Sequence, residues 1–350
     1  MIDKNLCMSL FLGFRFVRDK NLNFFDGLSH HIFSPLPSTK IDYVSTTADI
    51  DRIIREKINE FYEPNKTAIL LSGGMDSAIL ASYLPKGTTA YTFQCIAPGA
   101  INETEQAKKY TDILGLNHEI IEIKWEDFEI LTPVLLRHNQ VPFHSIEVQL
   151  LKASLYAQSK GIDRIIYGDA ADYVFGGMDR IISKDWTYDE FYEKYTFLPP
   201  EKVLKNYVDI HFVYDKFKLE NNKIDFLSFL RDMMDIESYT TYEEAFDTAG
   251  IKYLDPYLSM KMVEPWDLER IRRGESKYMI RELFTERYPN LRIPEKIPMP
   301  RAMNQWLKYY EPKRPEFVEN CIKDLTGDQK WLCWCLERFL NMYDKEKYNV

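Results

Sequence analysis

A short segment rich in glycine, serine and aspartate carries the clearest chemical signal in the sequence. It reads Leu71-Ser72-Gly73-Gly74-Met75-Asp76-Ser77 and lies between an apolar stretch and the start of a helical pattern. Glycine lacks a Cβ, so backbone N–H groups there can approach phosphates closely, and the helix that follows adds the positive end of its dipole. The serine hydroxyls can donate hydrogen bonds, and carboxylates such as Asp76 hold Mg²⁺ on phosphates. The segment therefore predicts a triphosphate site rather than a plain turn with a helix cap.

The same loop excludes two common nucleotide-binding designs. The Gly-x4-Gly-Lys pattern of Walker loops is absent, and so is the Gly-x-Gly-x-x-Gly pattern of dinucleotide sites. Transfer of a γ-phosphoryl group, as in kinases, is therefore disfavoured.

The elements that must position this loop alternate between strands and helices. Such alternation predicts an α/β fold, in which helices cover both faces of a parallel sheet. We expect strands at 67–71, 89–94, 118–123 and 164–167, and helices at 48–62, 76–84, 103–114 and 145–159. The composition of Ser9–Val17 is typical of another strand.

After about residue 179 the strand pattern gives way to amphipathic helices. We expect these at 202–217, 226–234, 277–288 and 330–342. The chain would then have a lead-in segment at 1–47, a nucleotide-binding domain at 48–180, and a C-terminal helical lobe at 181–350 packed on that domain.

Composition limits the class of protein. A net charge of −9 over 350 residues argues against broad contact with nucleic acid. The five cysteines are scattered, so a disulfide framework is not expected, and Cys333-Trp334-Cys335 fits a helix core better than a redox or metal pair. The N-terminus lacks the features of a signal peptide and of a membrane span, which predicts a cytoplasmic protein without membrane contact.

A second glycine-bearing segment resembles a motif of a known family. Gly168-Asp169-Ala170-Ala171-Asp172-Tyr173-Val174-Phe175-Gly176-Gly177 resembles the Gly-Glu-Gly-Ala-Asp-Glu-Leu-Phe-Gly-Gly segment of asparagine synthetases and β-lactam synthetases. The Ser72–Ser77 loop is similar to the pyrophosphate-binding (PP) loop of the N-type ATP pyrophosphatases. The stretches 102–107 and 114–118 also resemble this family. The resemblance implies an adenine nucleotide α-hydrolase-like fold and runs from about residue 9 to about residue 310.

The resemblance implies roles for individual residues. Asp76 and Asp172 would hold Mg²⁺ on the phosphates of ATP, and Lys277, which begins a Lys-x-x-Leu-Arg-like segment, would bind phosphate. Asp169 stands near the expected reacting centre; it would accept a proton from the attacking ammonium or amine, or else cap a helix. The residues expected to contact ATP are Leu71, Ser72, Gly73, Gly74, Asp76, Ser77 and Gly168.

The sequence also departs from the family pattern. Tyr173 stands where a Glu is usual. Ile293-Pro-Glu-Lys-Ile297 resembles the Leu-Pro-x-x-Ile segment that leads to a catalytic Arg-x-Lys, but the expected Lys is missing, and Arg301 is the candidate to replace its charge. The Arg-x-Pro that precedes the Leu254-Asp255 segment in aspartate-using enzymes is not evident, which weakens aspartate as the substrate. His144 is either a pocket residue or, more simply, a structural histidine.

The implied activity is that of an ATP-dependent, amide-forming ligase. It would adenylate a small-molecule carboxylate, release pyrophosphate, and transfer the acyl group to ammonia or an amine. The family's glutaminase domain is not expected here, because residue 2 is Ile and no segment of that length precedes the loop. Nitrogen would come from free ammonia, a separate amidase or an amine co-substrate.

Two alternatives stay open. One is another adenylating enzyme of this loop type, acting in RNA-base modification or thiolation; the acidic charge and the absence of a paired-cysteine site speak against it. The other is a nucleotide-binding regulatory protein without catalysis, which the changes at Tyr173 and near Arg301 motivate.

Overall fold

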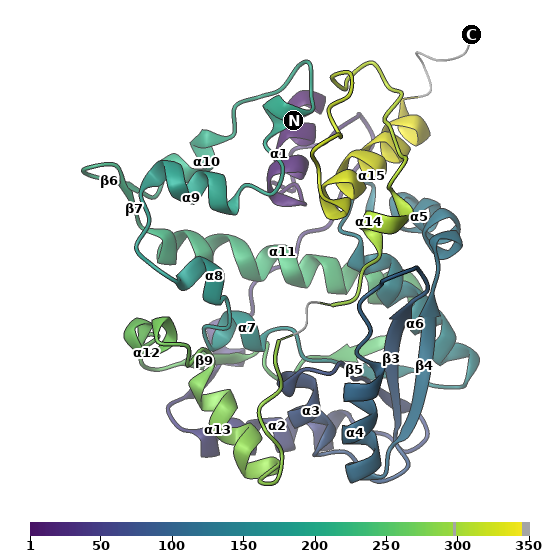
Figure 1. Ribbon diagram of the computed structural model, residues 1–350, viewed down its shortest axis with the longest axis vertical. Helices are drawn as coiled ribbons and strands as arrows, with labels where there is room; N and C mark the ends of the chain where they lie inside the picture. Colours follow the sequence, from purple (N-terminus) through teal and green to yellow (C-terminus); the bar gives the residue numbers. More distant parts are fainter. Residues whose placement is uncertain (297–298, 345–350) are drawn as a thin grey trace.

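A parallel sheet forms the framework beneath the predicted site (Figure 1). The computed structural model describes residues 1–296 and 299–344. Ile297, the last residue of the Leu-Pro-x-x-Ile-like segment, the following Pro298, and the end of the expected lobe at 345–350 lie outside the described residues. The five strands follow the order β4-β3-β2-β5-β8, and every neighbouring pair is parallel. Their bounds are β2 Thr67–Leu70, β3 Thr89–Cys95, β4 Asn117–Ile123, β5 Arg164–Ile166 and β8 Lys252–Leu254.

Helices cover both faces of this sheet, as the alternating pattern predicts. Successive side chains of a strand point to opposite faces, so Ala68 and Leu70 join one buried cluster while Ile69 and Leu71 join the other. The helices of the first cluster that follow the strands in the α/β part are α5 Trp125–Asn139 and α6 Ile146–Ser159, and helices nearer both ends of the chain add to that cluster. Those of the second are α2 Thr47–Phe61, α3 Met75–Ala81, α4 Thr104–Leu114 and α13 Tyr278–Arg287. The predicted α/β fold is thus confirmed.

Two elements of the sheet layer were missed from the sequence. β8 has three residues, Lys252-Tyr-Leu, which is too short to show a period. α5 has Pro133 in its interior, and a proline there normally predicts a helix end.

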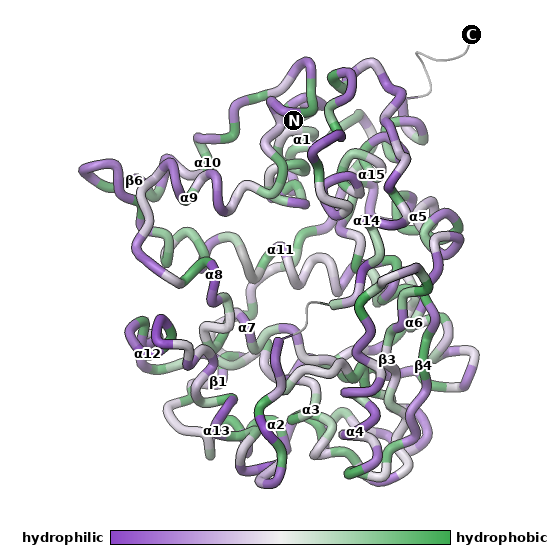
Figure 2. The backbone as a smooth tube through the Cα atoms, in the orientation of Figure 1, coloured by the Kyte–Doolittle hydropathy of each residue, from purple (hydrophilic) through white to green (hydrophobic). Residues whose placement is uncertain are grey.

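The N-terminal segment corrects the expectation of a strand at Ser9–Val17. It forms α1, Lys4–Phe14, in which the Asp3 carboxylate accepts a hydrogen bond from the Leu6 N–H and so caps the first turn. Residues Cys7 to Phe14 are all buried. A helix that is apolar all round lacks the 3.6-residue stripe by which helices are recognised, and its hydrophobic colour is plain in Figure 2.

The second half of the chain is largely helical, but the expected helix at 202–217 is wrong. Residues 200–202 form a single 3₁₀ turn, and Leu204 then pairs with Phe317 in an isolated bridge. The backbone hydrogen bond from Lys205 N–H to Glu316 O further ties this stretch to a remote segment. A short helix, α10 His211–Asp215, follows. Pairing with residues about a hundred positions away therefore replaces local helix formation.

The central helix of this half is α11, Phe226–Ala249, which crosses the middle of Figure 1. It contains the expected helix at 226–234 and continues well beyond it. The sequence pattern indicated only the first part because the helix is apolar on several faces and shows little amphipathic contrast. α15 Gly327–Tyr343 agrees with the expected helix at 330–342, and Cys333 and Cys335 are fully buried in it, as predicted.

Smaller elements complete the described structure. They are β1 Asp42–Val44, β6 Lys218–Leu219, β7 Lys223–Ile224, β9 Met260–Met262, α7 Ala171–Val174, α8 Asp179–Ile182, α9 Tyr188–Tyr195, α12 Leu268–Arg272 and α14 Met303–Trp306. Among the described residues, we find no helix with the length and apolarity to cross a bilayer. The segment after residue 180 supplies β8 to the sheet and packs α11 on α5 and α6; the division at 47 and 180 stays a prediction.

Candidate active site

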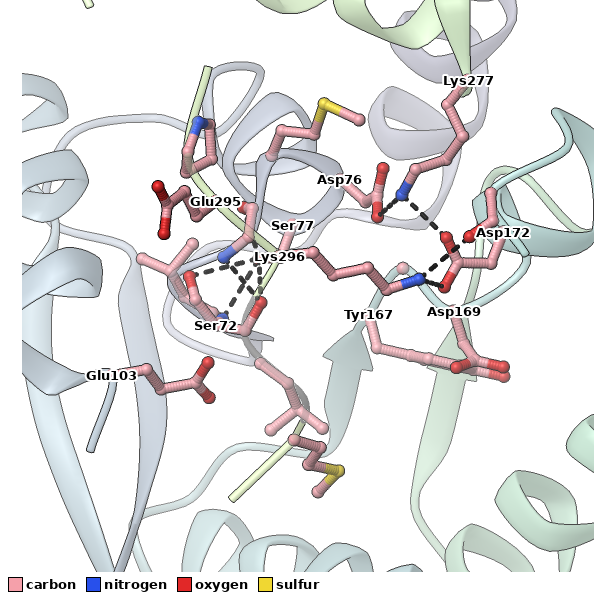
Figure 3. A pocket seen from close by; sticks show the side chains of 18 of the residues that line it. Ser72, Asp76, Ser77, Glu103, Tyr167, Asp169, Asp172, Lys277, Glu295 and Lys296 are labelled. Carbon is pink, nitrogen blue, oxygen red and sulfur yellow. Dashed lines mark hydrogen bonds and ion pairs between the residues drawn. The ribbon is translucent and has the colours of Figure 1, made fainter. Parts of the chain in front are cut away.

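The two glycine-bearing segments meet at a cavity of about 260 Å³ (Figure 3). It lies beyond the carboxyl ends of β2 and β5. The chain leaves β2 toward β3 and β4 on one side and returns to β5 on the other, and such a switch in strand order is where open α/β sheets bind ligands. The predicted site residues that line the cavity are Leu71, Ser72, Gly74, Asp76, Ser77, Gly168, Asp169, Asp172 and Lys277.

The loop after β2 is held in shape by its own serines. The Ser72 and Ser77 hydroxyls lie 2.9 Å apart, and the Gly74 N–H donates to Ser72 Oγ at 3.1 Å. Gly73 lies elsewhere than expected. Its N–H donates to Glu103 Oε2 at 3.2 Å, and a Cβ at this position would approach Gln106 Cβ to 2.8 Å. The structure therefore places Gly73 against α4, where close packing explains the glycine.

A lysine joins the two aspartates predicted to hold the metal. Lys277 Nζ lies 2.6 Å from Asp76 Oδ2 and 2.8 Å from Asp172 Oδ1, and its side chain is almost fully buried. Its backbone adopts the left-handed region, with φ of 51°, directly before α13. This conformation is unfavourable for a lysine and is typical of functional positions. It aims the ammonium group at both carboxylates.

A second lysine reaches the same aspartate from the segment after α13. Lys296 Nζ lies 2.7 Å from Asp172 Oδ2 and 3.1 Å from the Gly177 carbonyl oxygen (Figure 3). Its side chain is 59% exposed and lines the cavity, so a ligand in the cavity can reach the ammonium group. Lys296 falls on a variable position of the Leu-Pro-x-x-Ile pattern, so the sequence analysis did not predict that it belongs to the site.

Charge in this cluster controls the protonation of its members. Burial opposes the charge of Lys277, but Asp76 and Asp172 outweigh that effect and raise its pKa. Burial raises the pKa of Asp76 despite the nearby Lys277. For Asp172, burial is overcome by Lys277 and Lys296, and its pKa is lowered. The two lysines thus keep Asp172 ionised.

Asp76 and Asp172 fit the requirements of a Mg²⁺ ion. Both carboxylates approach one cationic group, and Asp76 Oδ1 is buried without a hydrogen-bond partner. Within residues 1–296 and 299–344, no three His, Cys, Asp or Glu side chains gather as a metal site. Two carboxylates plus phosphates and water are a usual Mg²⁺ environment, so the phosphates of ATP would complete the coordination.

Two glycines of the second motif lie in tight spaces, and Gly177 is the one that makes room for this cluster. A Cβ on Gly177 would lie 2.1 Å from Asp172 Oδ1 and 2.7 Å from Lys277 Cδ. A Cβ on Gly168 would lie 2.9 Å from Leu80 Cδ1. Any larger residue at 177 would therefore push the aspartate and the lysine apart.

Asp255, at the end of β8, braces the second motif. Its Oδ2 accepts hydrogen bonds from the Asp169 N–H at 2.9 Å and the Ala170 N–H at 2.8 Å, and its Oδ1 accepts one from the Tyr257 N–H. Burial raises the pKa of Asp255 to about 7, although these N–H donors favour the ionised form. These contacts make Asp255 a structural brace for the motif.

Asp169 faces the cavity with its carboxylate held by α11. Ser238 Oγ donates to one oxygen, and Tyr242 OH donates to the other at 3.2 Å. Helix capping, the alternative role, is not supported, because α7 has no side-chain cap. Burial raises the pKa of Asp169 to about 6, although the Ser238 hydrogen bond opposes the shift. A carboxylate with such a pKa can accept a proton near neutral pH.

Glu103 is a cavity residue that the sequence reasoning left without a role. It is buried, lines the wall beside Gly73, and has its pKa raised to about 7 by burial. The family-like stretch at 102–107 contained it and was the available signal.

Arg301 is not brought to the cavity. Its Nη1 lies 3.3 Å from His144 Nε2, and its Nε lies 3.3 Å from Asp328 Oδ1. Lys277 and Lys296 provide the cations at the Asp76–Asp172 pair. The expectation that Arg301 replaces the missing lysine therefore has no support in the geometry.

The helix-covered parallel sheet and the Ser-Gly-Gly loop between β2 and α3 define the PP-loop ATP pyrophosphatase fold. The family model for asparagine synthase matches residues 64–238, which is half of the chain, and the protein belongs to that family. Membership supports an ATP-dependent adenylating enzyme.

The other comparisons add little. No curated protein matches the chain significantly. Among solved structures, the chain is similar to the U34-tRNA thiolase NcsA from Methanococcus maripaludis, a protein with a [4Fe-4S] cluster. The identity is 13%, the match covers 84% of this chain and 79% of that one, and the TM-score is 0.32. A score of this size carries no argument about function.

Proposed function

We propose that the protein is an AMP- and pyrophosphate-forming carbon–nitrogen ligase. It would adenylate a small-molecule carboxylate and transfer the acyl group to ammonia or an amine. The observation that carries this proposal is the Asp76–Lys277–Asp172 cluster at the carboxyl ends of β2 and β5. Such a cluster offers two metal-binding carboxylates and a cation at one place, which matches the departing pyrophosphate of ATP.

In the first step, a substrate carboxylate oxygen attacks the α-phosphorus of ATP and pyrophosphate leaves. Bound Mg²⁺, held by Asp76 and Asp172, would supply positive charge to the phosphates. Lys277 and Lys296 neutralise charge on the leaving group, because both ammonium groups already lie at this end of the cavity. Ser72 and Ser77 present hydroxyls to the same phosphates.

In the second step, an amine nitrogen attacks the acyl carbon, the acyl–oxygen bond to phosphate breaks, and AMP leaves. Asp169 accepts the proton that the nitrogen loses, since its carboxylate faces the cavity and its pKa is raised to about 6. Phe93, Leu150 and Met299 give the cavity an apolar wall, which limits hydrolysis of the adenylate. The nitrogen would be free ammonia, ammonia from a separate amidase, or an amine co-substrate.

Exchange of labelled pyrophosphate into ATP tests the first step without any amine. At least one acid from a broad panel should support exchange, and added amine should then release AMP. Asp76→Asn should abolish exchange, whereas the exposed Asp112→Asn should not. The proposal would be refuted if the protein released neither AMP nor pyrophosphate from ATP with any of the acids.

The same assay separates the two alternatives. An RNA-modifying enzyme would release AMP with an RNA pool and lose that activity after RNase treatment. A regulatory protein would bind ATP tightly without turnover across all acids and amines.

A further inference from the structure

The Lys277 ammonium group occupies the space between the two carboxylates that would hold the metal (Figure 3). It lies 2.6 Å from Asp76 Oδ2 and 2.8 Å from Asp172 Oδ1, and only 6% of its side chain is exposed. The left-handed backbone of Lys277 is a conformation that persists only where the surrounding structure enforces it. Burial and this enforced backbone together hold the ammonium group at the two aspartates.

Both oxygens of the Asp172 carboxylate are already held by ammonium groups. Oδ1 pairs with Lys277 at 2.8 Å, and Oδ2 pairs with Lys296 at 2.7 Å. On Asp76, Oδ2 pairs with Lys277, whereas Oδ1 is buried and has no hydrogen-bond partner among the described residues. A divalent cation shared by the two aspartates must therefore take at least one oxygen from a lysine.

The charges of this cluster balance before any ligand arrives. The carboxylates of Asp76 and Asp172 are matched by the ammonium groups of Lys277 and Lys296. A divalent cation on its own would add positive charge next to two ammonium groups, and like charges repel strongly where water is largely excluded. A triphosphate reverses this balance, because its oxygens supply negative charge both for the metal and for a displaced ammonium group.

The Lys277 ammonium group has other partners available once a triphosphate is bound. Lys277 and Lys296 both line the cavity, as do Ser72 and Ser77 of the loop that would hold the phosphates. The ammonium group of Lys277 can therefore exchange its carboxylate partners for phosphate oxygens within the same cavity. The carboxylates of Asp76 and Asp172 are then open to the metal.

We propose that Lys277 is an internal substitute for the metal ion, which excludes a free divalent cation and admits the ion only together with a triphosphate. When the metal–triphosphate complex enters, the ammonium group passes from the two carboxylates to the phosphates. The place of the metal at Asp76 and Asp172 rests on the proposed function, whereas the order of binding depends on the ion pairs alone. Lys277 thus determines how the metal enters the site.

Binding of Mn²⁺ in the absence of any nucleotide tests this role. Mn²⁺ takes the same oxygen ligands as Mg²⁺, and electron paramagnetic resonance measures the fraction of the ion that stays free. The wild-type protein should bind Mn²⁺ at this site only after a non-hydrolysable ATP analogue is added. Lys277→Met, which removes the charge and keeps an unbranched side chain, should bind Mn²⁺ without nucleotide at least about tenfold more tightly than the wild type.

Two further variants locate the bound ion. Asp172→Asn introduced into Lys277→Met should remove the nucleotide-independent binding, because it takes away one of the two carboxylates. Lys108→Met also leaves a carboxylate without its lysine, since Lys108 forms an exposed ion pair with Asp112. It should bind Mn²⁺ no better than the wild type, because a single exposed carboxylate is a poor metal site.

Thermal unfolding keeps the test decisive even if Lys277→Met folds poorly. A ligand that binds only the folded protein raises its melting temperature. Mn²⁺ without nucleotide should therefore raise the melting temperature of Lys277→Met and leave that of the wild type unchanged. If Lys277 served only to stabilise the fold, its loss would lower the melting temperature by the same amount with and without Mn²⁺.

Three outcomes would overturn the inference. These are nucleotide-free wild-type protein binding Mn²⁺ as tightly as Lys277→Met, Lys277→Met gaining neither binding nor stability from Mn²⁺, and the added Asp172→Asn change leaving the binding intact. Pyrophosphate exchange by the wild-type protein is scored separately. Exchange together with tight nucleotide-free Mn²⁺ binding would refute this inference alone, and the expected Mn²⁺ behaviour without exchange for any acid would refute the proposed function alone.

Discussion

Lys277 Nζ lies 2.6 Å from Asp76 Oδ2, and this ion pair joins residues 201 positions apart in the sequence. The lysine extends from a strained, left-handed residue before α13 to the first turn of α3. It also contacts Asp172, so one buried cation balances two carboxylates that approach from different loops.

Replacement of Lys277 by Met should destabilise the protein strongly. The change leaves Asp76 and Asp172 facing each other with Lys296 as the remaining cation, and removing one partner of a buried ion pair costs about 3–5 kcal/mol. Urea unfolding at pH 7 measures the effect. Lys108→Met, which breaks an exposed pair with Asp112, should cost less than about 0.5 kcal/mol. Equal effects for the two variants would contradict the buried pair.

Gly177→Ala should reduce pyrophosphate exchange by about tenfold or more. The new methyl group cannot be accommodated next to Asp172 Oδ1 and Lys277 Cδ, so the carboxylate must turn away from the phosphates. Steady-state exchange rates and the melting temperature measure the two consequences. A pyrophosphate exchange rate equal to that of the wild-type protein would show that Asp172 is not needed where the structure places it.

Glu103→Gln should change how stability depends on pH. Burial raises the pKa of this carboxyl from 4.5 to about 7 in the folded protein. Below about pH 4.5 the carboxyl group is protonated in both the folded and the unfolded protein, so its burial does not lower the folding stability through ionisation. As the pH rises to about 7, the unfolded chain loses its proton first, and folding stability falls by about 3 kcal/mol.

The glutamine variant should lack this loss. Its free energy of unfolding relative to wild type should therefore rise between pH 4 and pH 8, as measured by urea unfolding at each pH. Glu105→Gln, an exposed change on the same helix, supplies the control. A difference that stays constant with pH would show that Glu103 keeps an ordinary pKa.

Asp255→Asn should weaken the brace on the second motif. Asn offers one carbonyl oxygen, so its amide group must face either the Tyr257 N–H or the pair of N–H groups from Asp169 and Ala170. We expect a loss of about 1.5–3 kcal/mol in the free energy of unfolding. Chemical denaturation measures it, and a neutral result would mean that β8 and the motif are held together by other contacts.

Asp169→Asn should separate the two chemical steps. Pyrophosphate exchange requires no proton transfer from the amine and should survive, whereas amide formation should fall by about 10²–10⁴-fold. Parallel assays of exchange and of amide product measure the split. Matched losses in both assays would assign Asp169 to substrate binding or to the fold.

Local sequence patterns were sufficient for much of the fold. Strands β2 to β5 and helices α2, α3, α4 and α6 follow the expected ranges closely, because each buries a periodic apolar face or a short apolar run between turn residues. The patterns failed where periodicity is absent. α1 and α11 are buried on several faces, β8 is very short, and residues 203–210 take their shape from remote pairing.

The sequence by itself determined the Ser72–Ser77 loop, the Gly168–Gly177 motif and the α/β class, because residue type and spacing within one segment fix backbone approach and strand–helix alternation. The tertiary structure alone decided that Lys296 reaches Asp172 and that Asp255 braces the motif. It also decided that Arg301 lies beside His144 and not at the place expected for the phosphates. These contacts join segments far apart in the chain. Their geometry depends on how whole elements pack, and no local spacing records it.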